Sequence, residues 1–224
     1  MIKAFVSWSG GKDASFSFHK AAQNQDVEIA YLLNMVSEDG KRSRTHGVSS
    51  ELLKAQAKAI AIPIIQRRAA WETYEEEFKK AVLELKEKGV NAGIFGDIDF
   101  QVHRDWVERV CKECNIKPLF PLWQRERSEI LGEFIDSGFE AVVVAAKSDV
   151  LGLSWVGRRI DEKFVEEMER LNNIDLCGEA GEYHTFVFDG PIFKKKIKIL
   201  KTEKIQRDKS WFLDILDYEI ADSI

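Results

Sequence analysis

The first residues suited to chemistry lie near the amino terminus, where a short apolar run ends in Ser-Gly-Gly-Lys-Asp at residues 9–13. Residues 14–25 then show the pattern of a helix. Glycines between a strand and a helix let backbone N–H groups face a ligand, and the helix N-terminus adds a partial positive charge. Lys12 supplies a full positive charge, and Asp13 can hold the Mg²⁺ that accompanies polyphosphates. The loop therefore predicts a site for a pyrophosphate-containing ligand with Mg²⁺.

The loop does not match two common phosphate-binding patterns. It is not a Walker A loop, because Val6 stands where that pattern needs a glycine, and it is not G-x-G-x-x-G either. The simplest alternative is a tight Gly-Gly turn followed by a solvated Lys-Asp pair. Its place after the first apolar run, with serines on both sides, favours phosphate binding.

A second group of polar residues lies in Cys-Gly-Glu-Ala-Gly-Glu-Tyr-His-Thr-Phe at residues 177–186. Glu179, Glu182 and His184 fall within six residues of one another, on a glycine-containing turn just before an apolar run. Burying carboxylates and an imidazole together is costly unless they bind something. A polar hairpin with exposed acids is the alternative.

Three further sets of residues allow more than one interpretation. Asp97 follows the fourth apolar run, where strand ends line the ligand crevice of open α/β sheets, so it is a candidate metal or ammonium ligand, or a helix cap. His103 and Arg104 either meet a substrate or lie on a solvated face. Cys111 and Cys114 have no second pair of metal ligands, so we interpret them as reduced helix cysteines.

The elements that position these residues follow from alternating apolar and amphipathic stretches. Continuous apolar runs separated by helix-length segments predict a parallel sheet covered on both faces. The apolar runs are residues 2–8, 27–36, 62–66 and 91–98, and the helical stretches are 14–25, 49–60, 71–88 and 101–114.

The rest of the chain has a mixed pattern. Two prolines within residues 117–123 suggest a boundary, which we place between residues 1–122 and 123–224. A helix, an apolar run and a second helix follow, and the tail alternates at period two over 183–190, 194–206 and 210–221. We therefore predict an α/β chain: an open parallel-sheet nucleotide-binding domain followed by a smaller mixed α+β domain. Lysines that alternate with isoleucines near residue 197 are typical of an edge strand.

Composition narrows the class of protein. The 224 residues carry a net charge of −5, which argues against a protein that coats nucleic acid or anionic membrane. No apolar run approaches the ~18 residues of a membrane helix, and no signal-peptide pattern is present, so we expect a cytoplasmic protein. Three cysteines fit a reducing compartment. Composition does not fix the oligomeric state, and a homo-oligomer is compatible with it.

The loop resembles the S-G-G-x-D-S loop of the N-type ATP pyrophosphatases, and the whole chain resembles the diphthine–ammonia ligase family of archaea and eukaryotes. The stretches that carry the resemblance span most of the chain: SGGKDAS (9–15), LLNMVSED (32–39), THGV (45–48), GDI (96–98), PLFPLW (118–123), GLSWVGRRID (152–161) and CGEAGEYHTFV (177–187). One position departs from the family pattern, because Ala14 stands where the family loop usually has serine. Ser15 or the backbone N–H of Ala14 would have to replace that hydroxyl.

The resemblance implies an activity. It is the amidation of diphthine on translation elongation factor 2 with ammonium, through an acyl-adenylate, with MgATP converted to AMP and pyrophosphate. The trimethylammonium group of diphthine suits carboxylates beside an aromatic face. Two alternative functions remain: that of a tRNA-thiolating enzyme of the same superfamily, and that of a non-catalytic ATP or AMP sensor.

The resemblance also implies the site residues. Lys12, Asp13, Glu182 and His184 are expected to be catalytic, with Asp13 on Mg²⁺ and Glu182 or His184 taking a proton from ammonium. The nucleotide is expected on Ser9, Gly10, Gly11, Lys12, Asp13, Ala14, Ser15, Asn34, Met35, His46, Gly96 and Asp97, with Val36 beside the adenine. The substrate is expected on Glu179, Gly181, Glu182, Tyr183, His184 and Thr185.

Overall fold

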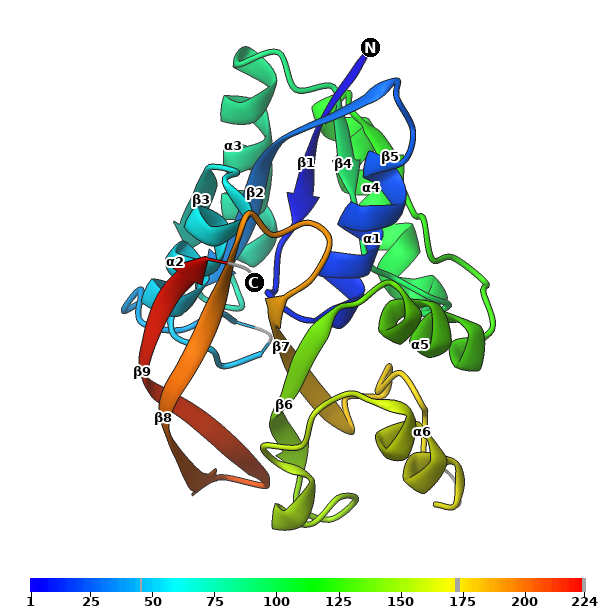
Figure 1. Ribbon diagram of the computed structural model, residues 1–224. Helices are drawn as coiled ribbons and strands as arrows, with labels where there is room; N and C mark the ends of the chain where they lie inside the picture. Colours follow the sequence, from blue (N-terminus) through cyan, green and yellow to red (C-terminus); the bar gives the residue numbers. More distant parts are fainter. Residues whose placement is uncertain (45, 172–173, 223–224) are drawn as a thin grey trace.

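The computed structural model describes residues 1–44, 46–171 and 174–222, so Thr45 of the T-H-G-V stretch lies outside the described residues. Its first part is a five-stranded parallel sheet in the order β3-β2-β1-β4-β5 (Figure 1). The central strand is β1, and its apolar middle residues Ala4, Phe5 and Val6 are fully buried. The strands are β1 (Ile2–Ser7), β2 (Val27–Val36), β3 (Ile64–Arg68), β4 (Ala92–Ile94) and β5 (Lys117–Leu119).

Helices cover both faces of this sheet. On one face, α1 (Lys12–Ala22) and α2 (Ser50–Ile60) contribute to a core that continues into the second part of the molecule. On the other face, α3 (Tyr74–Glu87) and α4 (Gln101–Cys114) pack into a separate core. The predicted α/β fold with alternating strands and helices is therefore confirmed.

The second part is a four-stranded antiparallel sheet in the order β7-β6-β9-β8, with β8 at an edge as the Lys-Ile alternation predicts. Figure 1 shows the long β8–β9 ribbon, in orange and red, curving away from the first sheet. The elements are α5 (Arg127–Asp136), β6 (Glu140–Lys147), η1 (Leu153–Trp155), α6 (Glu162–Glu169), β7 (Tyr183–Asp189), β8 (Lys195–Arg207) and β9 (Ser210–Asp222). None of the described helices has the length and apolar character needed to span a bilayer.

The short strand β5 differs from the sequence-based prediction, which placed only a boundary in residues 117–123. Pro118 lies in this strand, where it is tolerated because β5 is at the edge of the first sheet. The first sheet thus ends at Leu119 and the second begins at Glu140. We retain the division near residue 122 as a proposal.

A buried glutamine on α2 fastens the two sheets together beside the loop at residues 9–13. The Gln56 amide nitrogen donates to the carbonyl oxygens of Gly10 (3.0 Å) and Val187 (2.6 Å), and its oxygen accepts from Trp8 Nε1 (2.8 Å). The Val187 N–H also donates to the Gly10 carbonyl oxygen at 2.9 Å. The Gln56 side chain thus connects three segments: the residue that follows β1, the loop and β7.

We expect Gln56→Leu to lower the free energy of unfolding by about 2–4 kcal/mol, because the buried indole N–H of Trp8 loses its acceptor and the two carbonyls lose a donor. Urea unfolding measures this loss. The same change at the exposed Gln206, on β8, should alter stability by less than about 0.5 kcal/mol. Equal effects of the two substitutions would contradict the role of Gln56.

Candidate active site

A cavity of about 290 Å³ opens at the carboxyl ends of β1, β2 and β4, facing the second sheet. This is the position expected of a ligand site, because the strand order reverses direction between β1 and β4. Most of the residues predicted from sequence line it: Ser9, Lys12, Asp13, Ala14, Asn34, Met35, His46, Gly96, Asp97, Glu179, Gly181, Tyr183, His184 and Thr185.

Five residues expected at the site do not line the cavity: Gly10, Gly11, Ser15, Val36 and Glu182. Ser15 is fully buried in α1, and its hydroxyl has no partner among the described residues, so it does not replace the hydroxyl absent at Ala14. Gly11 lies against the ring of His46, and a Cβ there would collide with that ring. Gly11 thus allows a close approach of two chain segments.

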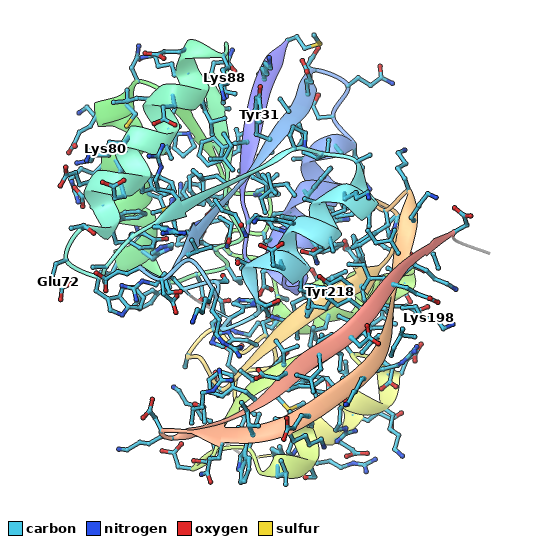
Figure 2. The ribbon with its side chains drawn as sticks, turned by 90° about the vertical axis from the view of Figure 1, so that its left-hand side faces the viewer. Tyr31, Glu72, Lys80, Lys88, Lys198 and Tyr218 are labelled. Atoms are coloured by element: carbon cyan, nitrogen blue, oxygen red, sulfur yellow. The ribbon has the colours of Figure 1, made fainter. Side chains whose placement is uncertain are left out.

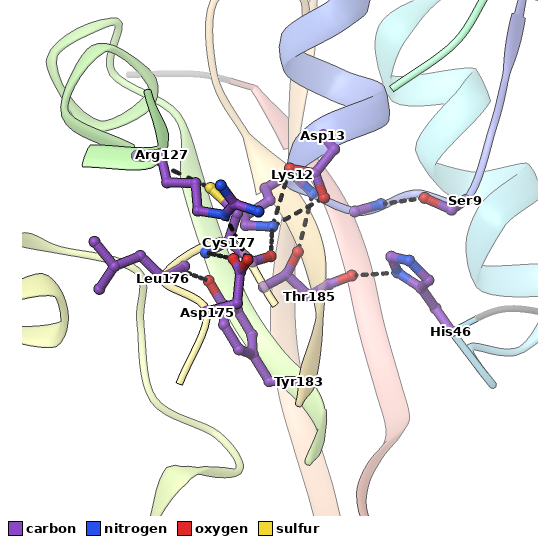
Figure 3. Close-up of polar contacts among 11 residues, drawn as sticks. Ser9, Lys12, Asp13, His46, Arg127, Asp175, Leu176, Cys177, Tyr183 and Thr185 are labelled. Atoms are coloured by element: carbon purple, nitrogen blue, oxygen red, sulfur yellow. Dashed lines mark hydrogen bonds and ion pairs between the residues drawn. The ribbon is translucent and has the colours of Figure 1, made fainter. Parts of the chain in front are cut away.

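The N-terminus of α1 supplies backbone donors to the cavity. Its first N–H, that of Lys12, donates to Thr185 Oγ1 on β7 at 2.9 Å (Figure 3). Within the described part of the chain, no hydrogen bond to the N–H groups of Asp13 and Ala14 is found, and Gly11 provides no side-chain cap. These two donors, with the positive end of the helix, are available to an anion. A backbone donor is therefore present at Ala14 although the hydroxyl is not.

Gly96 lets β4 approach this turn. A Cβ at Gly96 would lie 3.0 Å from the carbonyl carbon of Asp13 and 3.1 Å from the nitrogen of Ala14. Any larger residue would push the helix N-terminus away from the cavity wall. Sequence reasoning placed Gly96 at the site but did not identify this reason.

Lys12 and Asp13 form an ion pair at the cavity wall. Lys12 Nζ lies 2.9 Å from both carboxylate oxygens of Asp13 and also donates to the carbonyl oxygen of Cys177 (Figure 3). Burial alone would lower the pKa of Lys12, but the Asp13 carboxylate raises it above its ordinary value, so the ammonium stays charged. The ring of Tyr183 lies 5.3 Å from the same ammonium, and its hydroxyl donates to the Leu176 carbonyl.

Two more carboxylates line the cavity. Glu179 has a pKa raised to about 7, first by burial and then by the charge of Asp13. Asp97 binds His103 Nδ1, which raises the pKa of His103. The cap alternative for Asp97 is wrong, because Phe100 occupies the N-cap of α4 and no side chain caps it. This acidic wall favours a bound cation.

The carboxylates of this wall can be compared with the ligands that Mg²⁺ needs. Among the described residues no group of three potential metal ligands is found. Mg²⁺ beside a polyphosphate usually takes only one or two carboxylates, since phosphate oxygens and waters complete its shell. Asp13, at the cavity wall next to the free N–H groups, therefore suits this role.

Two histidines far apart in the chain meet at the cavity: His46 in the loop between β2 and α2, and His184 on β7. The rings of His46 and His184 stack with centroids 4.5 Å apart, and His46 Nδ1 lies 3.0 Å from the Thr185 carbonyl oxygen. Burial lowers the pKa of His46 to about 4 and that of His184 to about 3. Both rings are therefore neutral near pH 7.

A network of ionic contacts holds the turn that carries Glu179. Arg127 at the start of α5 binds Asp175 and, at 2.6 Å, Asp99. The Asp175 N–H donates to Glu182 Oε1 at 3.2 Å, while Glu182 Oε2 is buried without a partner among the described residues. Glu182 thus supports the turn from beneath, whereas Glu179 faces the cavity.

Comparison with known proteins decides the family. The family model of the diphthamide synthase N-terminal domain matches residues 2–118, and that of the diphthamide synthase C-terminal domain matches residues 126–221. The chain belongs to the diphthamide synthase family. The two matched regions meet at the cavity, because the loop at residues 9–13 lies in the first and the Glu179 turn lies in the second.

Individual relatives of this diphthamide synthase family member support the same assignment. The chain is similar to proteins named diphthine–ammonia ligase from Homo sapiens (33% identical over 222 aligned residues, 88% of this chain and 82% of the relative) and from Bos taurus (31% over 232, 92% and 86%). The similar protein of that name from Saccharomyces cerevisiae is 24% identical over 231 aligned residues, which cover 86% of this chain and 34% of the relative.

Sequence reasoning missed several residues that shape the site. Gln56 and Trp8 fix the loop, and Arg127 and Asp175 fix the Glu179 turn. The only sequence signal for Gln56 is its place on the apolar face of α2, between the buried Leu53 and Ile60. The contacts of Arg127 leave no local signal, because its two carboxylate partners are 28 and 48 residues away.

The raised pKa of Glu179 predicts a pH-dependent stability. An acid with a raised folded-state pKa stabilises the fold below its unfolded pKa, and this contribution is lost as pH rises through about 7. Glu179 alone should therefore lower the free energy of unfolding between pH 5 and pH 8, whereas the lowered pKa values of His46 and His184 raise it over the same range. Because the histidines are common to both proteins, we expect the free energy of unfolding of Glu179→Gln to rise by about 2 kcal/mol more than that of the wild type between the two pH values, allowing for partial exposure. Urea unfolding at both pH values measures it.

Glu87→Gln, an exposed position on α3, is the matched control and should keep the wild-type slope. Parallel pH profiles for wild type and Glu179→Gln would show that Glu179 titrates as an ordinary glutamate.

Proposed function

We propose that this chain catalyses the ATP-dependent amidation of diphthine on translation elongation factor 2 with ammonium, giving diphthamide, AMP and pyrophosphate. Membership of the family makes the chain a ligase of diphthamide biosynthesis. The observation that carries the finer proposal is a single cavity in which free N–H groups and Lys12 face an acidic wall. Such a cavity suits a polyphosphate together with a quaternary ammonium group.

The polyphosphate half of the cavity would bind ATP. The N–H groups of Asp13 and Ala14 would donate to phosphate oxygens, and Lys12 would neutralise charge that develops on the departing pyrophosphate. ATP supplies the adenylyl group that activates the diphthine carboxylate as an acyl-adenylate. Asn34 and Met35, at the end of β2, line the cavity where we expect the adenine.

Asp13 would hold the Mg²⁺ that accompanies ATP. In the structure its carboxylate is paired with Lys12, so binding of MgATP requires that this pair open and each partner take an oppositely charged group of the nucleotide. Lys12 and Asp13 are then already at the wall where the two charges are needed. Positioning and charge neutralisation need no covalent intermediate on the chain.

The acidic half of the cavity would bind diphthine and ammonium. Glu179 has a pKa raised to about 7, and a trimethylammonium group bound beside it would favour its ionised form, whereas the ring of Tyr183 already faces Lys12. Of the two candidates for taking the ammonium proton, only His184 lines the cavity, so we assign this role to His184 and a positioning role to Glu182. The pKa of about 3 makes the ring of His184 a weak base, so this role requires that the negative charge of the bound substrates raise that pKa.

One cysteine bears on the tRNA-thiolation alternative. Cys177 lines the cavity, but burial raises the pKa of its thiol to about 12, and the thiol lies 3.7 Å from the Arg127 carbonyl oxygen. A persulfide carrier requires a reactive thiolate. This environment favours a structural role for Cys177.

Pyrophosphate release in the presence of MgATP, ammonium and diphthine-bearing elongation factor 2 tests the proposal. We expect release that depends on all three, and a fall in kcat of about 100-fold or more in Lys12→Ala and Asp13→Ala. Lys20→Ala is the matched control on α1, because Lys20 pairs with Glu133 at 2.6 Å outside the cavity.

Undiminished AMP formation by Lys12→Ala and Asp13→Ala would refute the assigned roles. Nucleotide binding without any pyrophosphate release would indicate a sensor. Turnover that ignores the elongation factor would indicate a different acceptor.

A further inference from the structure

We propose that an aromatic ledge at the mouth of the cavity docks the polypeptide that surrounds the substrate side chain. The ledge consists of Trp71, Tyr74, Phe100, His103 and Trp106, at the beginnings of α3 and α4. The proposal rests on the proposed function, because a diphthine side chain can enter the cavity only if its protein lies against the mouth.

Four of the five rings, those of Trp71, Tyr74, Trp106 and His103, form a continuous series of contacts. The ring of Trp71 stacks on Tyr74 (6.0 Å between centroids), Tyr74 contacts Trp106 (5.9 Å), and Trp106 stacks on His103 (5.6 Å). Phe100 precedes α4, and its backbone carbonyl oxygen accepts from the backbone N–H of His103 at 3.1 Å. The inner members of the ledge, Tyr74, His103 and Trp106, line the cavity. The ledge therefore leads from the site to the surface.

The outer members are unusually exposed for apolar residues. Trp71 is 64% exposed and Phe100 59%, and Val102, in the first turn of α4, is 70% exposed. Exposed apolar side chains near the mouth of a cavity are typical of interaction sites. In Figure 2 the labels Glu72, Lys80 and Lys88 follow α3 along its length, with Glu72, the neighbour of Trp71, at the end nearer the second sheet.

Arg44 adds a charge to the outer end of the ledge. Its guanidinium carbon lies 4.6 Å from the centre of the Trp71 ring, and within the described chain it forms no ion pair, unlike Arg42, which binds Asp214. The Arg44 N–H donates to the carbonyl oxygen of Met35, so the residue extends from the strand end that lines the cavity. Tryptophan and arginine are both enriched in the hot spots of protein interfaces.

These features define the chemistry of the partner surface. It should present an apolar side chain to Trp71 and Phe100 and a carboxylate to Arg44, next to the residue that enters the cavity. A second copy of this chain is the competing occupant, and the experiment below separates the two.

Equilibrium binding of diphthine-bearing elongation factor 2 tests the ledge, measured without ammonium so that no turnover occurs. We expect Trp71→Ala to raise Kd about tenfold or more and Arg44→Glu to raise it further, with Kd for MgATP unchanged. Leu83→Ala is the matched control, because Leu83 is an exposed apolar residue (46%) on α3 that does not line the cavity.

Wild-type affinity in Trp71→Ala, or failure of the wild-type chain to bind the factor, would overturn the proposal. A shift from dimer to monomer in Trp71→Ala, measured by sedimentation, would also overturn it, because the ledge would then join two copies of this chain. Binding that depends on Trp71 without any amidation would support the ledge and refute the proposed reaction, so the two failures are distinguishable.

Discussion

The site depends on one hydrogen bond that crosses from the first sheet to the second, between the Lys12 N–H and Thr185 Oγ1. It caps the beginning of α1 with a side chain from β7, so the glycines before the helix are free of a capping side chain of their own. The next two N–H groups of the helix are left to a ligand. The backbone bond from Val187 to Gly10 and the three contacts of Gln56 hold the same register. The loop that we propose for the nucleotide is completed by the other sheet, which explains why both halves of the chain are needed for one cavity.

The positions of the charged groups in the cavity follow from this arrangement. The loop brings Lys12 and the helix N-terminus to one wall, and the turn after Cys177 brings Glu179 to the other. The two walls touch where Lys12 binds both Asp13 and the Cys177 carbonyl oxygen. A ligand that separates Lys12 from Asp13 therefore also affects the turn that carries Glu179. The proposed binding of a polyphosphate and that of a cationic side chain would in this way be physically connected.

The sequence predicted the features that depend on local pattern. The alternating apolar runs indicated the parallel sheet, and the glycines followed by Lys12 and Asp13 indicated a loop that the structure places at the cavity, because those residue types act through backbone geometry close to them in the chain. Anion binding at this loop stays a prediction. Predicted helix ends were less accurate: α1 begins at Lys12 rather than at residue 14, so Lys12 and Asp13 belong to its first turn.

Features that depend on distant partners were not predictable. Thr185 lies 173 residues from Lys12, and Gln56 lies 131 residues from Val187. Glu182 and Glu179 have similar sequence surroundings, and only the fold shows that one supports the turn while the other faces the cavity. The strand β5 escaped notice because it has three residues and contains a proline.

A crystal structure with Mg²⁺ and a non-hydrolysable ATP analogue tests the central claim most directly. We predict that the triphosphate lies on residues 9–15, with oxygens within hydrogen-bonding distance of the Asp13 and Ala14 N–H groups and with Lys12 Nζ moved from Asp13 to a phosphate. A triphosphate bound elsewhere, or a Lys12–Asp13 pair that persists beside the bound nucleotide, would contradict it.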